Sequence, residues 1–136
     1  MADAELRFKI EEWLKYAKRD LDSANFLCGM IPVPIEIICF HCQQSAEKSL
    51  KAFIVSKGIE PKKTHDLVDL QNTCNEYDDF NSLTVECVML RNFGVQPRYP
   101  FALQIEEEDM KAALKMAEKI YDFVSKKLNQ FLEDKK

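Results

Sequence analysis

Glycine is scarce in this 136-residue sequence, which contains only three, at positions 29, 58 and 94. A loop that cradles phosphate with backbone amides needs several glycines close together, so their dispersal excludes such a loop. Each glycine is followed three residues later by proline. A glycine just past a helix end supplies a left-handed C-cap, and a nearby proline prevents the helix from continuing. The three pairs therefore predict three helix ends.

Long hydrophobic runs and export signals are also lacking. The most apolar stretch, 26–40, is interrupted by Pro32, Pro34 and Glu36 and is too short to span a bilayer. The first ten residues, MADAELRFKI, are charged and have no apolar core of the kind found in a signal peptide. The five cysteines are odd in number and lack the even spacing of a secreted disulfide framework. These features predict a cytoplasmic protein with free thiols and no membrane association.

Histidine is rare, with only His41 and His65 present. His41 lies between Cys39 and Cys42, a spacing that superficially suggests a metal site. Cysteines three apart on a helix share one apolar side, where cysteine acts as a small hydrophobe. No second Cys/His pair completes a tetrahedral set. We therefore expect core thiols, with no metal and no other cofactor.

Apolar residues recur at steps of three and four, and no segment alternates with period two, so the sequence predicts an all-α protein. The first helix is expected over 5–30. The second should begin at Pro34 and end at Lys57. The third should follow an N-cap at Thr64 and run from His65 to about Tyr77. The fourth is expected over 83–93 and the fifth from the acidic run 106–109 to Phe131. The first helix has an apolar side formed by Leu6, Ile10, Trp13, Leu14, Ala17, Leu21 and Ala24. In the fourth helix, the residues expected to face inward are Val85, Val88, Met89 and Phe93.

These elements predict one domain over 1–136, with a core of about 5–131. The expected fold is an up-and-down bundle of four to five antiparallel helices, in which the first, second and fifth form most of the core.

Polar residues follow one stripe of the second helix. Gln44, Lys48 and Lys51 are spaced i, i+4 and i+7, so their side chains share one side. Amide and ammonium donors suit phosphate or a nucleotide. They equally suit a dimer seam or water, and composition leaves these alternatives open. The formal net charge of −4 does not indicate a nucleic-acid coat.

A second candidate site lies before the fifth helix. Arg98 and Tyr99 stand between Pro97 and Pro100. A guanidinium beside an aromatic ring on a stiff backbone can bind phosphate while stacking a base. Alternatively, Tyr99 fills the end of the bundle and Arg98 binds carbonyl groups of the fourth helix.

Four segments together resemble the HEPN family, the higher eukaryotes and prokaryotes nucleotide-binding domain. They cover about residues 8–128 and occur in the family's order. The matching residues are Trp13, Leu14, Ala17, Asp20 and Leu21; the run CQQSAEKSLKA at 42–52; THDL at 64–67 with Leu70; and RYP at 98–100. The resemblance implies a helical bundle that is usually a homodimer. It also implies a minimal nucleotidyltransferase as partner, in a two-component or toxin–antitoxin module.

Many HEPN proteins are metal-independent ribonucleases with an Arg-x(4–6)-His motif, in which histidine is the base and arginine steadies the phosphate. This sequence departs from the motif, because six residues follow Arg91 and the next is Arg98. No histidine occurs after His65. Arginine stays protonated and cannot accept a proton, so the general base that RNA cleavage needs is missing from that place.

Two functional interpretations follow from the resemblance. In the first, the protein is a non-catalytic partner of a nucleotidyltransferase and offers Arg98, Tyr99, Gln44, Lys48 and Lys51 to a nucleotide or RNA. In the second, it is a divergent ribonuclease toxin. His65 or His41 then replaces the missing base and acts together with Arg91. The missing histidine favours the non-catalytic interpretation.

Overall fold

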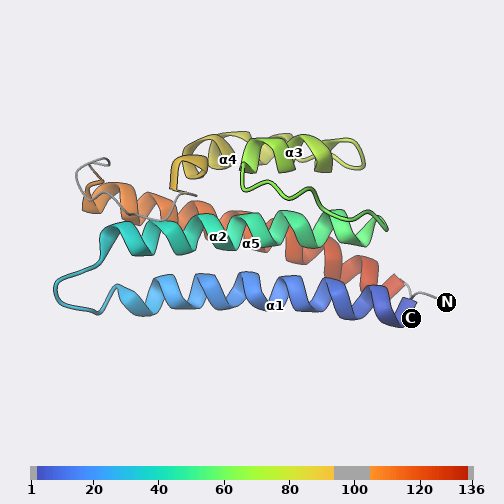
Figure 1. The fold of residues 1–136 in the computed structure, drawn as a ribbon, viewed down its shortest axis with the longest axis horizontal. Coiled ribbons are helices and arrows are strands. Elements are labelled where there is room, and N and C mark those ends of the chain that lie inside the picture. Colours follow the sequence, from blue (N-terminus) through green and yellow to red (C-terminus); the bar gives the residue numbers. More distant parts are fainter. Residues whose placement is uncertain (1–2, 94–104, 135–136) are drawn as a thin grey trace.

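The computed structural model describes residues 3–93 and 105–134, and it forms a helical bundle (Figure 1). Three long helices lie side by side, and two short ones cover α2 on the side away from α1 (Figure 1). The helices are α1 (Asp3–Leu27), α2 (Ile35–Ser56), α3 (Leu67–Asn75), α4 (Thr84–Leu90) and α5 (Glu107–Asp134), with 3-10 turns η1 (Asn81–Leu83) and η2 (Arg91–Phe93) flanking α4. The all-α bundle is confirmed. Helix α1 runs antiparallel to α2 and α5, which point the same way because the chain returns through α3 and α4 (Figure 1).

Helix α2 begins and ends within one residue of the predicted positions, Pro34 and Lys57, which are its caps. Pro34 occupies the N-cap position, and its carbonyl oxygen accepts a bond from the amide of Ile38 at 3.0 Å. At the other end Lys57 is the C-cap, and Gly58 follows with φ +76°. This is the left-handed conformation that glycine adopts most readily. Within the described residues Gly58 is the only glycine with positive φ, so the left-handed cap expected at Gly29 is wrong.

Helix α3 starts two residues later than predicted. Asp66, not Thr64, is its N-cap, and the Asp66 carboxylate accepts a bond from the amide of Val68 at 2.9 Å. Thr64 instead accepts the amide of Asp66 through its hydroxyl oxygen, at 3.1 Å. Both side chains can cap a helix, but only Asp66 stands directly before the first residue with helical geometry.

Helix α4 faces the core with a different side from the one predicted. Val85, Val88 and Met89 are 64%, 44% and 52% exposed, whereas Cys87 and Leu90 are fully buried. The prediction was wrong because α4 is apolar on two sides, so its periodicity fits either orientation. Phe93 does pack against the core, as expected.

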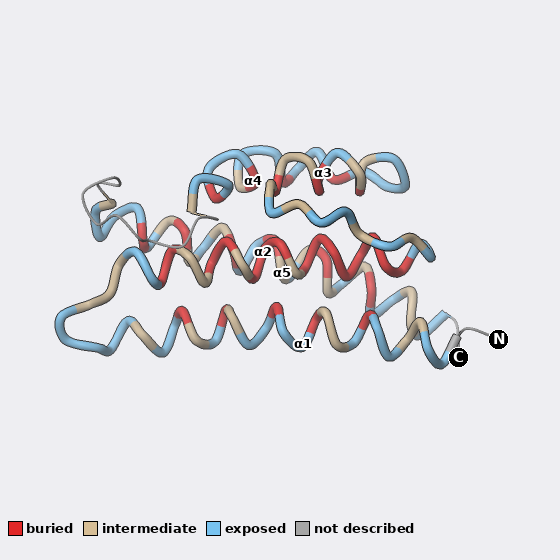
Figure 2. The backbone as a smooth tube through the Cα atoms, in the orientation of Figure 1, coloured by how far each residue is buried: buried red, intermediate tan, exposed pale blue. Residues whose placement is uncertain are grey.

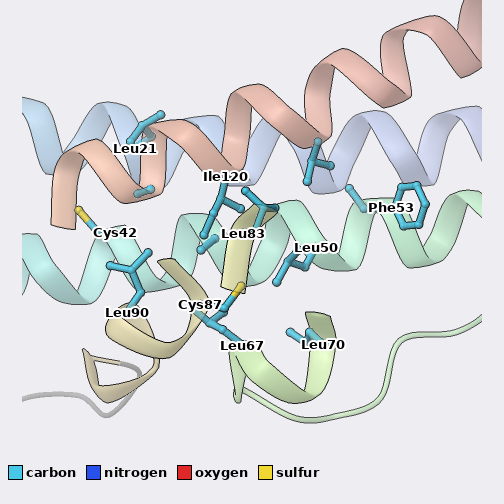
Figure 3. Close-up of a cluster of buried hydrophobic side chains, with 14 of the residues drawn as sticks. Leu21, Cys42, Leu50, Phe53, Leu67, Leu70, Leu83, Cys87, Leu90 and Ile120 are labelled. Carbon is cyan, nitrogen blue, oxygen red and sulfur yellow. The ribbon is translucent and has the colours of Figure 1, made fainter. Parts of the chain in front are cut away.

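The core lies where α2 meets all the other helices. Leu50 and Phe53 of α2 lie among residues of α3, α4 and α5 (Figure 3). The second half of α2 is buried on nearly every side, while α1 and α5 bury one side each (Figure 2). No helix among the described residues combines the length and the apolar character needed to cross a bilayer.

The cysteines of the CFHC segment are core thiols, as predicted. Cys39 and Cys42 are both fully buried. Burial raises the pKa of the Cys39 thiol to about 12, and it raises the pKa of Cys42 as well. A thiol that stays protonated is a poor nucleophile and a poor metal ligand. Both residues therefore contribute to packing.

Candidate ligand-binding site

A buried carboxylate, Glu47, organises the polar residues of α2. Its side chain is only 5% exposed. Lys51 donates to its Oε2 at 3.0 Å, and His65 approaches its Oε1 through Nδ1 at 3.0 Å. Gln43 and Gln44 each donate from Nε2 to the Oε1, at 3.4 and 3.3 Å. A buried charge is tolerated only when it is paired and hydrogen-bonded, and these four partners meet that requirement.

The same network fixes the predicted stripe of donors. Lys51 is 9% exposed on its side chain, and its ammonium lies 5.8 Å from the centre of the Trp13 ring. Gln44 donates to Gln43 at 2.7 Å as well as to Glu47. Lys51 therefore lies beneath the surface, and Gln44 is half-buried. Lys48 is the more exposed of the two lysines in this stripe.

Lys48 belongs to a second polar cluster, centred on Asp20 of α1. The Asp20 carboxylate accepts from Lys48 Nζ at 2.5 Å and meets His41 Nδ1 at 3.0 Å. The Lys48 side chain remains 26% exposed and that of His41 29%. An ammonium has three donors, so one bond to Asp20 leaves Lys48 with donor capacity toward a ligand.

The two residues of the ribonuclease alternative, His65 and Arg91, are both linked to Asp66, the first as its neighbour in the chain and the second through an ion pair. Arg91 donates from Nη2 to the second carboxylate oxygen of Asp66 at 2.6 Å. His65 precedes Asp66, and its side chain is 72% exposed although its Nδ1 is held by Glu47. The structure thus brings a guanidinium and an oriented imidazole to the start of α3.

Two grooves run along α1. The first, called the aromatic groove below, lies between α1 and α2. It is lined by three aromatic residues, Phe8, Trp13 and Tyr16, and three charged ones, Lys9, Glu12 and Lys48. The second, called the basic groove, is open and lies farther along the same helix. Its charged and titratable lining residues are Lys15, Lys18, Arg19, Asp22, His41 and Tyr121.

Sequence reasoning missed most of these groove residues. Phe8 and Tyr16 are 63% and 43% exposed. Both are aromatic residues outside the apolar stripe of α1. An aromatic residue on the polar side of a helix is the signal that could have revealed them. Of the predicted ligand residues that the structure describes, Gln44, Lys48 and Lys51, only Lys48 lines either groove. Arg98 and Tyr99 lie outside the described residues.

No group of three or more histidine, cysteine or acidic side chains suited to a metal ion occurs in the part of the chain that the structure describes. The polar clusters and the grooves contain aromatic rings, ammonium and guanidinium groups, and two imidazoles held by carboxylates, His41 by Asp20 and His65 by Glu47. This chemistry suits an anionic ligand that carries a flat ring.

A bundle of five helices is the fold that the resemblance to HEPN proteins implies. Comparison of the sequence with family models identifies the family. The family model described as HEPN domain matches residues 10–128. The chain belongs to the HEPN domain family.

Two solved structures are similar to this chain. TT1696 from Thermus thermophilus is 27% identical, with a TM-score of 0.76 over 88% of this chain and 98% of that one. ST0689, an archaeal HEPN homologue, is 24% identical, with a TM-score of 0.66 over 87% of this chain and 96% of that one. The second likeness concerns the fold alone. No protein with a curated description is significantly similar in sequence.

Proposed function

We propose that this HEPN-domain protein is a non-catalytic, cytoplasmic binding module for a nucleotide or phosphate group. One observation carries the proposal: Lys48, on the family-like segment of α2, lines a groove together with Phe8, Trp13 and Tyr16. An ammonium beside aromatic rings can pair with phosphate while a base stacks. The Asp20 carboxylate holds Lys48 in this position.

Each predicted ligand residue has a role in this proposal. Lys48 contacts phosphate directly. Lys51 and Gln44 support the site, because Lys51 lies against Trp13 and Gln44 binds Glu47. Arg98 and Tyr99 add a second phosphate contact and a second stacking ring, on the grounds of the family resemblance.

Calorimetric titration with ATP, and separately with inorganic phosphate, tests the binding role. The charge-removing change Lys48→Ala should weaken nucleotide binding about tenfold, the loss of one hydrogen bond to a charged group. Lys111→Ala is the matched control, because Lys111 is exposed on α5 and lines neither groove. Equal affinity in both variants, or no binding of either ligand to the unaltered protein, would refute the proposal.

The partner role is a separate part of the proposal. We infer from the family resemblance that the protein forms a homodimer and associates with a minimal nucleotidyltransferase. Sedimentation at micromolar concentration should give twice the chain mass of 15.8 kDa. A nucleotidyltransferase encoded in an adjacent reading frame should co-purify with the protein at a fixed ratio. A purely monomeric species and no complex would contradict this part.

A second candidate function, metal-independent RNA cleavage, is favoured by one specific arrangement. The Glu47 carboxylate holds Nδ1 of His65, and Arg91 is anchored to the adjacent Asp66. A carboxylate that orients an imidazole is a common way to prepare a general base, and arginine is suited to phosphate.

An RNA-cleavage assay in chelator separates the two functions. The ribonuclease function requires cleavage that falls at least a hundredfold in His65→Ala, the usual size of a general-base contribution, and that also falls in Arg91→Ala. The non-catalytic proposal requires no cleavage above a buffer control. His41→Ala distinguishes the two candidate bases, because cleavage that falls in this variant and not in His65→Ala would assign the base to His41.

A further inference from the structure

The connection between α1 and α2 carries the two most exposed large apolar side chains of the described residues. Ile31 is 94% exposed and Phe26 is 83% exposed, and Met30, between them in the chain, is 54% exposed. These three residues are called the apolar tip below. Figure 1 shows the connection projecting at one end of the bundle. Exposed apolar surface gathered in one place marks a contact with another molecule, whereas scattered single residues do not.

The backbone holds the apolar tip in a fixed shape. The amide of Met30 donates to the carbonyl oxygen of Leu27 at 3.0 Å, so a hydrogen-bonded turn follows the end of α1. Pro32 and Pro34 come next, and the ring of each fixes its own φ. A partner therefore meets apolar side chains on a backbone that is already ordered, which lowers the entropy cost of binding.

Acidic residues surround the apolar tip. No charged residue occurs from 23 to 35, and the start of α5 lies at the same end of the bundle (Figure 1). The flanking positions 22, 36 and 106–111 contain six acidic residues and one basic residue, Lys111. Burial, followed by the charges of Asp109 and Glu36, raises the pKa of the Cys39 thiol. Residues of α5 and α2 therefore contribute to one negative region.

The charge of this region decides which kind of molecule fits the tip. Glu36, Glu107 and Glu108 are exposed, and none of them has an ion-pair partner among the described residues. The surface of a cytoplasmic membrane leaflet is itself negative, so these carboxylates oppose insertion of the tip into lipid. A protein surface on which lysine or arginine borders apolar side chains complements both the tip and the carboxylates.

We propose that the apolar tip is a docking surface for another protein, in which lysine or arginine residues border an apolar side. Phe26 and Ile31 contact the apolar side, and the carboxylates at the starts of α2 and α5 pair with the cations. The surface is separate from the proposed nucleotide site, because no residue of the tip lines the aromatic groove. The inference therefore goes beyond nucleotide binding and can fail without it.

Fluorescence anisotropy with three labelled helical peptides tests this inference. The first has leucine at helical spacing on one side and lysine elsewhere, the second has glutamate in place of lysine, and the third has serine in place of leucine. The first should bind at least tenfold more tightly than either of the others, since burial of one large apolar side chain contributes about that factor. Failure of the first peptide to bind, or equal binding of all three, would overturn the inference.

Substitutions show where the leucine–lysine peptide binds. Ile31→Ser and Phe26→Ser should each weaken its binding about tenfold, whereas Val85→Ser, at a 64% exposed position on α4, should not. Glu108→Lys should weaken it about threefold, the contribution of an exposed ion pair, and Glu133→Lys, at the opposite end of α5, is the matched control. Ile31→Ser should leave ATP binding unchanged. Undiminished peptide binding in both tip variants would contradict the proposed surface.

Cys28 gives a second readout inside the same connection. Its thiol belongs to an exposed residue, and the other four cysteines are buried. Bound leucine–lysine peptide should slow the alkylation of Cys28 by iodoacetamide in proportion to the fraction of protein that is occupied. An unchanged rate at saturating peptide would place the peptide elsewhere and overturn the inference.

Two other occupants are outcomes of parallel measurements, in which unaltered thermal unfolding shows that Ile31→Ser folds. Vesicles of phosphatidylcholine, with and without phosphatidylserine, test a lipid surface. Vesicle binding that is lost in Ile31→Ser, without peptide binding, would make the tip a membrane contact. Sedimentation tests a second copy of the chain. A dimer that Ile31→Ser converts to a monomer, again without peptide binding, would make the tip a contact between copies, and either result overturns the inference.

Discussion

Glu47 and His65 lie 18 residues apart, and both oxygens of the Glu47 carboxylate lie within 3.1 Å of His65 Nδ1. Gln43, one turn earlier on α2, donates to the backbone carbonyl of the same histidine at 2.8 Å. The segment between α2 and α3 is thus fastened to α2 at both the side chain and the backbone of His65. Residues of two separate family-like segments meet in this contact.

Removing the charge of Glu47 should destabilise the fold strongly. In Glu47→Gln the ammonium of Lys51, only 9% exposed, loses its carboxylate partner. Breaking a buried pair from one side costs about 3–5 kcal/mol, so the urea midpoint should fall sharply. Glu118→Gln, an exposed change on α5, should leave the midpoint unchanged. The double variant Glu47→Gln/Lys51→Met should recover part of the loss, and no recovery would contradict a paired interaction.

Asp66 has two separable roles, which paired substitutions can distinguish. One oxygen caps α3 through the amide of Val68, and the other accepts from Arg91. Asp66→Ala removes both and should cost about 1 kcal/mol or more in the free energy of unfolding. Asp66→Asn keeps a capping oxygen and should cost less. Equal losses in chemical denaturation would show that the cap contributes nothing.

The orientation of α4 is tested by substitution on its two apolar sides. Leu90→Ala creates a cavity at a fully buried position and should cost about 2–5 kcal/mol. Met89→Ala changes a side chain that is 52% exposed and should cost far less. Thermal unfolding of the two variants measures the difference. The reverse order would favour the orientation that the sequence predicted.

Buried thiols should make stability fall at alkaline pH. Burial raises the pKa of the Cys74 thiol from 9.0 to about 12. Between these values the unfolded chain has lost the proton and the folded chain retains it. The unfolded state therefore binds fewer protons, and the free energy of unfolding decreases as pH rises from about 9 toward 12, by at most roughly 1.4 kcal/mol per pH unit for one thiol.

The measurement for this effect is urea unfolding at pH 8, 9 and 10, compared between the unaltered protein and Cys74→Ala. The variant should lose stability less steeply above pH 9, because one of its titrating thiols is gone. Groups present in both proteins cancel in the comparison. Parallel curves would show that the Cys74 thiol is not protected by burial.

The helices themselves could be predicted from the sequence, because a helix is set by local periodicity and by its ends. The start of α2 at Pro34 and its end before Gly58 follow from caps that involve only neighbouring residues. The burial of Cys39 and Cys42 follows from spacing along one side of a helix. The resemblance to the HEPN family was also readable, since its motifs are short and lie in order.

Tertiary structure decided every feature that depends on a partner distant in sequence. Spacing placed Lys51 one turn after Glu47, but only the fold buried this pair, and only the fold placed Lys48 in a groove with residues of α1. Helix α4 has two apolar sides, and packing against the other helices chose between them. The aromatic groove exists because α2 brings Lys48 beside Trp13 and Tyr16 of α1. Local patterns determine where a helix forms, and the neighbours that it meets determine which of its side chains can reach a ligand.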